Sequence, residues 1–386
     1  SCNSLFSFKL FIEQYHIVKK LLRFSRKLIK NLMSQFYSLK VNQIKKETHD
    51  SVSVSFEIES KLANDFKFIP GQYITIKINI NGEDCRRSYS ICSSSNEKLT
   101  VAIKKVPNGR MSNFINNNLK TGDFIDVSTP EGNFKLENID SSNNRKFVAF
   151  AAGSGITPIL SMIKEINLKE RNTQFLLFYS NKTSNDVMFK SEINSLLNDN
   201  FSVKYIYTRE ETDLELYNGR IDENKTTQLL KSEMSFLNAD GFYLCGPEEM
   251  IFSAKKVLES FDVSNEKINF ELFTTPVLEK EESTSMVNEN DFSGTSNVTV
   301  ICDDEEVEFS LDSSGESILD AAMEQDLDVP FSCKGAVCCT CKAKVKTGKV
   351  TMDANYALSE QEVDEGYILA CQAHPASADV TVDFDY

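Results

Sequence analysis

The chain has 386 residues, of which 41% are hydrophobic and 26% charged, and its net charge at pH 7 is -15. This length allows two to four compact domains. The acidic balance argues against a nucleic-acid-binding protein, because such a surface repels a polyanion. No apolar run approaches the ~20 residues that cross a bilayer, which argues against an integral membrane span.

The first segment, residues 1–33, differs in charge from the rest of the chain. It contains seven Lys and Arg residues and a single acid, Glu13, among apolar residues that recur in a roughly helical pattern. This pattern is typical of an amphipathic membrane-surface helix or of a transit peptide. We favour a third interpretation, a non-native or translated upstream extension in front of a natural start at Met33.

Residues 34–140 alternate apolar and polar side chains in short runs, as half-buried strands do. Examples are Ser51–Ile58 and Tyr73–Ile80, and the Asn81-Gly82 pair after the second run indicates a hairpin turn. Several short strands at this spacing predict a small antiparallel β-barrel.

Residues 141–276 change to a rhythm of strand, turn and helix. The predicted strands and helices, in chain order, are Lys146–Ala151, Ile159–Ile166, Gln174–Tyr179, Phe189–Leu197 and Ser202–Tyr207. Strands that alternate with helices predict an α/β domain with a parallel sheet.

Residues 277–296 are polar, acidic and Ser-rich, which is typical of a linker. The last unit, residues 297–386, holds 19 acidic residues and 5 lysines, so we expect a separate domain with its own partner surface. A domain of about ninety residues cannot bury a large core, and a metal site would stabilise it.

Four cysteines of this last unit have the spacing of metal ligands. Cys333 is followed by Cys338 and Cys341 in one short loop, and Cys371 lies further along the chain. This is the plant-type spacing of four thiolates on a [2Fe–2S] cluster, and it indicates a reducing compartment. A structural zinc site is the alternative, but zinc sites usually carry paired CxxC knuckles or histidines. We expect Cys339 to be a packed thiol rather than a fifth ligand.

The segment Ser332–Val345 resembles the cluster loop of the reductases of multicomponent oxygenases. With Arg87-Ser88-Tyr89-Ser90 and Ala151–Pro158, it makes the chain from residue 34 onward similar to the ferredoxin–NADP reductase superfamily, and within it to the reductase components of phenylacetyl-CoA epoxidases. The domains that this resemblance implies are a Greek-key FAD-binding β-barrel (34–140), an NAD(P)-binding α/β domain (141–276) and a β-grasp [2Fe–2S] ferredoxin domain (297–386).

The resemblance also implies a flavin site. Arg87 would bind the flavin pyrophosphate with paired donors, Tyr89 would contact the isoalloxazine and ribityl groups, and Ser90 would hydrogen-bond flavin N5. The other flavin-site residues that it implies are Ser88, Tyr73 and, at a helix start facing the phosphates, Gly109, Arg110, Met111 and Ser112. FAD is the expected cofactor, with FMN as the alternative.

For the nicotinamide nucleotide, the resemblance implies a phosphate-binding turn and a locus of hydride transfer. The turn holds Gly153, Gly155 and Thr157 at the start of a helix, where N–H groups and the helix dipole favour phosphate. The residues implied at the hydride-transfer locus are Cys245, Gly246, Pro247, Glu271 and Phe273. Glu271 would assist proton transfer and Phe273 would cover the flavin ring, so these two join Ser90 and Cys245 as the expected catalytic residues.

Arg209 follows a predicted strand and resembles the residue that binds the 2′-phosphate in NADPH-using relatives, with Arg220 in support. NADPH is therefore expected rather than NADH, with solvated surface charge as the alternative interpretation of Arg209.

The expected function is electron transfer from NADPH through FAD and the [2Fe–2S] cluster to an oxygenase, in the cytoplasm. A phenylacetyl-CoA epoxidase is the expected acceptor. Two alternatives stay open: another acceptor, such as a hybrid-cluster protein or a desaturase, or a membrane-recruited electron carrier held by the basic N-terminal helix.

Overall fold

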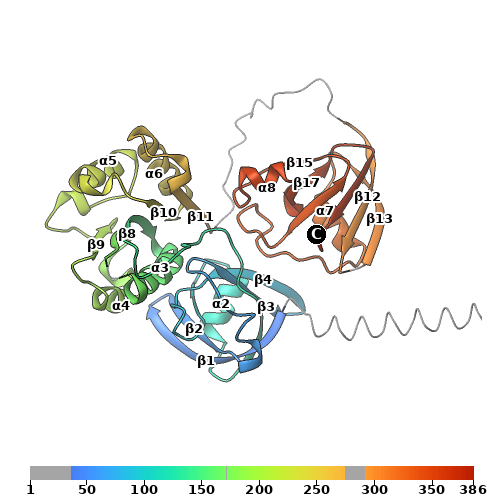
Figure 1. Ribbon diagram of the computed structural model, residues 1–386. Helices are drawn as coiled ribbons and strands as arrows, with labels where there is room; N and C mark the ends of the chain where they lie inside the picture. Colours follow the sequence, from blue (N-terminus) through green and yellow to red (C-terminus); the bar gives the residue numbers. More distant parts are fainter. Residues whose placement is uncertain (1–35, 171, 274–291, 304) are drawn as a thin grey trace, which may run out of the picture.

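The computed structural model describes residues 36–170, 172–273, 292–303 and 305–386, which form three compact units along the chain (Figure 1). The basic segment 1–33 with Met33, and most of the predicted linker, lie outside the described residues. Within the described ranges, no helix is both long and apolar enough to cross a membrane.

The first unit is a six-stranded antiparallel sheet in the order β4-β3-β6-β1-β2-β5. Its elements are β1 (Phe36–Thr48), β2 (Ser51–Glu57), β3 (Tyr73–Ile80), β4 (Glu83–Ser90), β5 (Thr100–Lys104), α2 (Arg110–Asn117) and β6 (Phe124–Ser128). A bridge between Ile91, just after β4, and Val101 of β5 joins the two edges of the sheet. This contact closes the sheet and confirms the predicted barrel.

The turn between β3 and β4 shows how the sequence specifies this barrel locally. Asn81 and Gly82 have φ angles of 57° and 89°, the left-handed conformation that a two-residue hairpin requires. The two strands then pair in register from Ile80 opposite Glu83 to Tyr73 opposite Ser90.

The second unit is a parallel five-stranded sheet in the order β11-β10-β7-β8-β9. Its elements are β7 (Lys146–Ala152), α3 (Ile156–Lys169), β8 (Gln174–Asn181), α4 (Lys190–Ser195), β9 (Phe201–Tyr207), α5 (Glu223–Ser232), β10 (Gly241–Gly246), α6 (Glu248–Ser260) and β11 (Ile268–Leu272). Successive β7 residues belong to two different cores: Phe147 and Ala149 pack with α3 and α4, whereas Val148 packs with α5 and α6. Helices therefore cover both faces, as an α/β fold requires.

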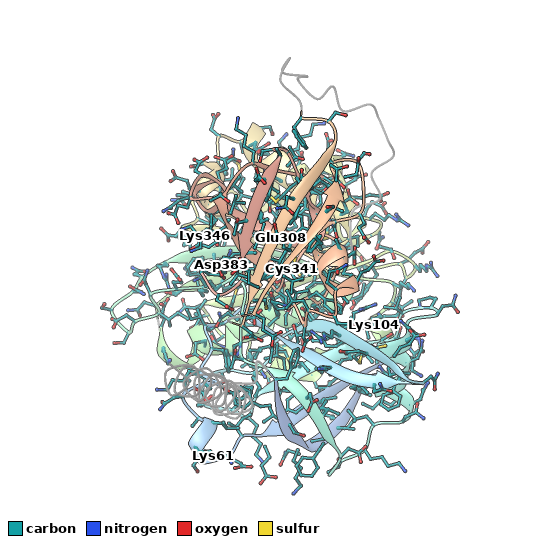
Figure 2. The ribbon with its side chains drawn as sticks, turned by 90° about the vertical axis from the view of Figure 1, so that its right-hand side faces the viewer. Lys61, Lys104, Glu308, Cys341, Lys346 and Asp383 are labelled. Carbon is teal, nitrogen blue, oxygen red and sulfur yellow. The ribbon has the colours of Figure 1, made fainter. Side chains whose placement is uncertain are left out.

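The third unit is a mixed sheet in the order β13-β12-β18-β14-β16 with a two-stranded β15-β17 sheet beside it. Its elements are β12 (Thr295–Cys302), β13 (Glu305–Asp312), α7 (Ile318–Glu324), β14 (Lys342–Thr347), β15 (Val350–Met352), α8 (Glu360–Asp364), β16 (Tyr367–Leu369), β17 (Ala373–Pro375) and β18 (Asp379–Asp383). The parallel β12–β18 pair lies at the centre, and α7 packs on the sheet. Figure 2 shows these strands face on, with Lys346 of β14 beside Asp383 of β18, a pair that the ion-pair distance places 3.1 Å apart. The predicted β-grasp ferredoxin unit is confirmed.

Candidate redox site

Three of the predicted catalytic residues meet where the barrel touches the parallel sheet. Ser90, at the end of β4, is buried and donates a hydrogen bond of 3.0 Å from Oγ to Glu271 Oε2. Glu271 lies near the end of β11, directly opposite Cys245 in the β10–β11 register. Phe273 follows just beyond β11 and is 39% exposed, so its ring is available to a ligand at this locus.

The environment of this cluster favours neutral groups. Withdrawal from water raises the pKa of Glu271 to about 8, although the hydrogen bond from Ser90 opposes the shift. Burial also raises the pKa of the Cys245 thiol well above its usual value, and the nearby Glu271 carboxyl adds to that effect. A carboxyl group with a pKa near 8 can hold or release a proton around neutral pH, as a proton-transfer residue must.

The glycine-rich turn after β7 lies beside this cluster. A Cβ on Gly155 would come within 2.1 Å of the Cys245 carbonyl oxygen, so only glycine allows the turn to pack against β10. Gly153 has a φ of 54° and open space where a Cβ would stand. Thr157 is buried in the first turn of α3 and donates from Oγ1 to Ser154 O at 3.0 Å. The turn therefore presents backbone and a helix start at the carboxyl ends of the parallel strands, where nucleotides bind in such sheets. Gly246 and Pro247 continue from β10 into α6 at the same end.

The predicted flavin residues lie along β3, β4 and the start of α2. Arg87 is exposed, and in the described structure its guanidinium donates to the Arg86 carbonyl at 2.6 Å with no carboxylate paired to it. Its remaining donors are therefore available to a phosphate. Burial raises the pKa of Tyr89, which precedes Ser90 on the same strand.

The start of α2 is organised by backbone rather than by charge. Gly109 is the N-cap, and Ser112 Oγ accepts a hydrogen bond of 3.1 Å from Val106 N, which folds the preceding loop onto the helix. Arg110 is exposed and pairs with Glu83, while Met111 is buried. The N–H groups of this first turn lack a side-chain cap, so the helix start suits an anion.

Tyr73 makes a contact with the third unit that its motif did not predict. The residue is buried, and its hydroxyl lies 3.3 Å from Thr340 Oγ1 and accepts a hydrogen bond of 3.1 Å from Cys339 N. Ser88 likewise donates from Oγ to Ser332 Oγ at 2.9 Å. Two residues expected at the flavin thus also contact the cysteine loop of the third unit.

The four predicted cluster ligands are arranged as two pairs. Cys338 donates from Sγ to Cys333 Sγ at 3.1 Å, which lowers the pKa of Cys333 to about 6. Cys341 forms the second pair with Cys371, and this contact lowers the pKa of Cys371 to about 7. Within the described residues, no three metal-ligating side chains are gathered tightly enough to hold one ion. Four thiols from these positions match the ligand number of a plant-type [2Fe–2S] cluster.

The backbone of the cysteine loop is shaped to donate to sulfur. Lys334 and Ala336 have φ angles of 51° and 63°, which bends the chain around the thiols. Gly335 N donates to Cys333 Sγ at 3.3 Å. Hydrogen bonds from backbone to sulfur stabilise thiolates and tune cluster potentials. Cys339 points away from this group: its Sγ lies 3.4 Å from Ala357 O, and burial raises its pKa to about 12.

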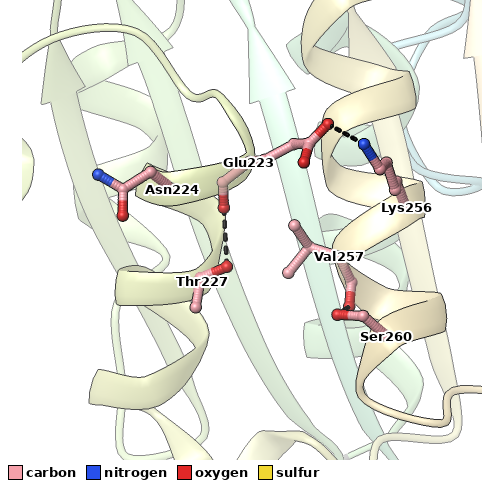
Figure 3. Close-up of a pocket in the computed structure, with 6 residues that line it drawn as sticks. All are labelled: Glu223, Asn224, Thr227, Lys256, Val257 and Ser260. Atoms are coloured by element: carbon pink, nitrogen blue, oxygen red, sulfur yellow. Dashed lines mark hydrogen bonds and ion pairs between the residues drawn. The ribbon is translucent and has the colours of Figure 1, made fainter.

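Arg209 lines a pocket of about 300 Å³ at the carboxyl end of β9. The other residues of the pocket are Tyr207, Thr208, Glu210, Glu211, Asn218 and Gly219. Arg220 is not among them; it is 81% exposed and pairs with Glu249 at 3.3 Å. A second pocket lies between α5 and α6, where Glu223 pairs with Lys256 at 2.7 Å (Figure 3), and it includes none of the predicted site residues.

Three family models match the chain in succession. They are an oxidoreductase FAD-binding domain over residues 38–136, an oxidoreductase NAD-binding domain over residues 150–256 and a 2Fe-2S iron-sulfur cluster binding domain over residues 300–376. The chain is also 37% identical to a component of the 1,2-phenylacetyl-CoA epoxidase of Escherichia coli (strain K12), over 92% of this chain and 99% of that protein. The chain belongs to the ferredoxin–NADP reductase-like flavoproteins that carry a C-terminal [2Fe–2S] ferredoxin domain.

Other relatives share this arrangement. The reductase is 30% identical to the ferredoxin reductase component of the 3-ketosteroid-9-alpha-monooxygenase of Mycolicibacterium smegmatis, over 92% of this chain and 98% of that protein. The solved structure of phthalate dioxygenase reductase covers 90% of this chain and 98% of its own with a TM-score of 0.56 and 22% identity, and it shares the three-part fold.

The protein is accordingly an NAD(P)H-dependent oxidoreductase with FAD and a [2Fe–2S] cluster. A flavin accepts an electron pair and releases single electrons, which is what a one-electron cluster requires. The structure brings Ser90 and Glu271 together at the junction, leaves open space beside Gly153 in the turn, and arranges the four predicted ligand cysteines in two pairs. Sequence reasoning missed Arg86, which is 5% exposed and contacts the third unit. Its position next to Arg87 in the chain gave no indication of its different environment.

Proposed function

We propose that this reductase is the electron-supplying component of an oxygenase and that its acceptor is a phenylacetyl-CoA epoxidase. The observation that carries the proposal is the likeness along the full length to a component of such an epoxidase, at 37% identity and with 99% of that component covered. The 3-ketosteroid monooxygenase reductase at 30% identity supports the oxygenase class while naming a different substrate.

The residue roles in this proposal follow the site geometry. Arg87, Ser88, Tyr89 and the α2 start bind FAD; the turn with Gly153, Gly155 and Thr157 binds the nucleotide phosphates. Ser90, Cys245, Glu271 and Phe273 form the hydride-transfer locus. Cys333, Cys338, Cys341 and Cys371 would hold the cluster as its four thiolate ligands. NADPH is the proposed donor, with Arg209 as the cation near its 2′-phosphate.

We also propose a cytoplasmic location. None of the nine cysteines that the structure describes forms a disulfide, which fits a reducing compartment.

Reconstitution tests the acceptor. The purified reductase is combined with the catalytic components of a phenylacetyl-CoA epoxidase, and NADPH-dependent epoxide formation is measured. As a matched comparison, the same reductase is combined with the oxygenase component of a 3-ketosteroid monooxygenase. Efficient turnover in the first mixture alone supports the proposal, whereas turnover in the second alone would replace the epoxidase with another acceptor.

A further inference from the structure

Most of the hydrogen bonds between the ferredoxin domain and the flavin barrel reach one short segment, residues 328–340, which leads into and contains the cysteine loop. The barrel side of this contact is the β3–β4 hairpin and the loop after β6. The side-chain contacts with this segment are Arg86 to Asp328, Ser88 to Ser332, Tyr73 to Thr340 and Asn133 to Cys339. Asn133 also donates to Ala357 O at 3.3 Å and to Glu362 Oε2 at 3.2 Å, beyond the segment. Four pairs of side chains thus meet at this segment, so the cluster-bearing loop is the main part of the ferredoxin domain that the barrel holds.

Arg86 is the central charged group of this contact. It is 5% exposed, and its guanidinium donates to Asp84 Oδ2 from Nε at 3.1 Å and from Nη2 at 2.9 Å. The same Nη2 donates to Asp328 Oδ1 at 3.0 Å. Asp84 belongs to the barrel, so it holds the guanidinium in place within its own domain. Asp328 belongs to the ferredoxin domain, so its hydrogen bond with Arg86 joins the two domains.

Phe331 of the ferredoxin domain also contacts the Arg86 guanidinium, through its ring. Its ring centroid lies 4.6 Å from the Arg86 guanidinium carbon and 4.7 Å from Lys334 Nζ. A planar guanidinium that is largely removed from water gains from such a ring face as well as from the carboxylate. Phe36 of the barrel covers Arg86 from another direction at 5.5 Å.

The position of Asp328 affects the position of the cysteine loop, because the two are close in the chain. It stands between Leu327 and Val329, which are 5% and 0% exposed and anchor the segment in the ferredoxin core. Its own side chain is 80% exposed and points outward to Arg86. Cys333 follows five residues later in the chain, so a shift at Asp328 moves the start of the cysteine loop relative to β4.

We propose that Arg86 is a positioning residue that docks the ferredoxin domain on the flavin barrel by binding Asp328 and Phe331. The dock holds the cysteine loop against β4, the strand that also carries Arg87, Tyr89 and Ser90. Its consequence is fast electron transfer from the flavin side to the cluster within the chain, whichever acceptor follows. Because Asp328 is exposed, salt screens the contact and weakens it.

The test uses the full chain with both cofactors and the variant Asp328→Asn. Asp328 is exposed, so the substitution leaves folding intact, and it removes the charge that Arg86 binds. Glu365→Gln is the matched control. Glu365 is an exposed acid of the same domain; it is the C-cap of helix α8 and accepts a hydrogen bond from Gln361 of that helix. Asp328→Glu keeps the carboxylate and serves as the rescue variant.

Two measurements are made on each protein. Stopped-flow absorbance gives the rate of cluster reduction after flavin reduction, and hydrogen exchange gives the protection of backbone amides in residues 328–340. Loss of one charge-assisted hydrogen bond shifts a docking equilibrium by roughly tenfold or more. We therefore expect Asp328→Asn to slow cluster reduction and to raise exchange in this segment by that order, with a weaker dependence on salt.

Rates, exchange and salt dependence like the wild type in Asp328→Asn would overturn the proposal. So would an equal effect in Glu365→Gln, because general loss of negative charge would then be the cause. Recovery of the cluster-reduction rate and of amide protection in Asp328→Glu supports the proposal. Reduction of ferricyanide by NADPH should be unchanged in all variants, because that route needs only the first two domains. The proposed acceptor can fail in reconstitution without affecting any of these outcomes.

Discussion

The barrel makes two junctions with its neighbours, and they are built differently. Its junction with the nucleotide domain shares one hydrophobic core, in which Phe134 and Leu136 of the barrel pack with Tyr243 and the α3 side chains. The ferredoxin domain has a core of its own, formed entirely by residues 298–382. Its contact with the barrel is made mainly by hydrogen bonds and one ion pair.

Buried polar groups strengthen the first junction further. Ser161 Oγ donates to Ser93 O at 2.7 Å, and Glu165 accepts from both N and Oγ of Ser95. The first two domains are thus joined by a shared core and by buried hydrogen bonds. The ferredoxin domain has its own core and meets the barrel through polar contacts, while its Val337 and Tyr356 pack on the nucleotide domain. Hydride transfer needs fixed geometry, but a cluster that must also serve an external partner benefits from a contact that can be released.

The strongest test of this division is loss of the cluster without damage to the flavin unit. Cys371→Ser removes one thiol of the Cys341–Cys371 pair, so we expect the [2Fe–2S] site to be abolished. The same result is expected for Cys333→Ser, Cys338→Ser and Cys341→Ser. Iron content and electron paramagnetic resonance of the reduced protein measure the outcome.

Cys339→Ser is the control for these variants, because the Cys339 thiol points toward Ala357 rather than toward the pairs. It should keep a normal cluster. A normal resonance spectrum in Cys371→Ser would show that the ligand assignment is wrong.

Removal of the whole ferredoxin domain is the second test. A chain ending at residue 277 keeps the shared core of the first two domains, so it should fold, retain FAD and reduce ferricyanide with NADPH. Reduction of cytochrome c should fall to background, because that route passes through the cluster. Equal cytochrome c rates with and without the domain would make the flavin the exit for electrons.

Glu271→Gln probes the junction between the barrel and the nucleotide domain. If Glu271 transfers a proton at this locus, flavin reduction by NADPH should slow by roughly a hundredfold, at the low end of what a positioned acid–base group contributes. Ser90→Ala, which removes only the hydrogen bond to Glu271, is the milder comparison. A reduction rate like the wild type in Glu271→Gln would exclude the proton-transfer role.

The pH dependence of stability gives an independent readout for the same residue. The pKa of Glu271 is about 8 in the folded protein against an ordinary value of 4.5, so the folded state holds a proton that the unfolded chain releases. The contribution of Glu271 to the free energy of unfolding is therefore highest below about pH 4.5 and decreases as the pH rises toward 8. Glu271→Gln should reduce this slope. A smaller slope of the same sign should remain in Glu271→Gln, because burial also raises the pKa of Glu131, to about 7.

The sequence was sufficient where local chemistry decides the structure. The Asn81-Gly82 hairpin, the glycine-rich turn before α3 and the cysteine spacing each specify their geometry within a few residues, and the three-part fold followed from them. Alternation of apolar residues predicted β3 with the bounds that the structure shows.

The contacts between domains could not be predicted in this way. Arg86 and Asp328 are 242 positions apart, and nothing in either sequence neighbourhood distinguishes Arg86 from the exposed Arg87. The motif of Tyr73 predicted a flavin-site residue and gave no indication of a second contact. Only the fold shows that its hydroxyl contacts the cysteine loop, since long-range pairs depend on how separately folded units meet.

The smallest expected effect concerns nucleotide choice, in the nucleotide domain. Arg209 lines the pocket at the end of β9, and a 2′-phosphate placed there would gain a charge-assisted hydrogen bond. Glu210 and Glu211 line the same pocket and oppose that charge, so we expect the lower end of the usual gain, roughly tenfold in binding. Arg209→Ala should raise the KM for NADPH by that order and leave the KM for NADH nearly unchanged. Arg220→Ala is the matched control, because Arg220 pairs with Glu249 outside the pocket, and it should change neither value. An equal effect of Arg209→Ala on both nucleotides, or a wild type that already prefers NADH, would make Arg209 a surface charge without a role in selection.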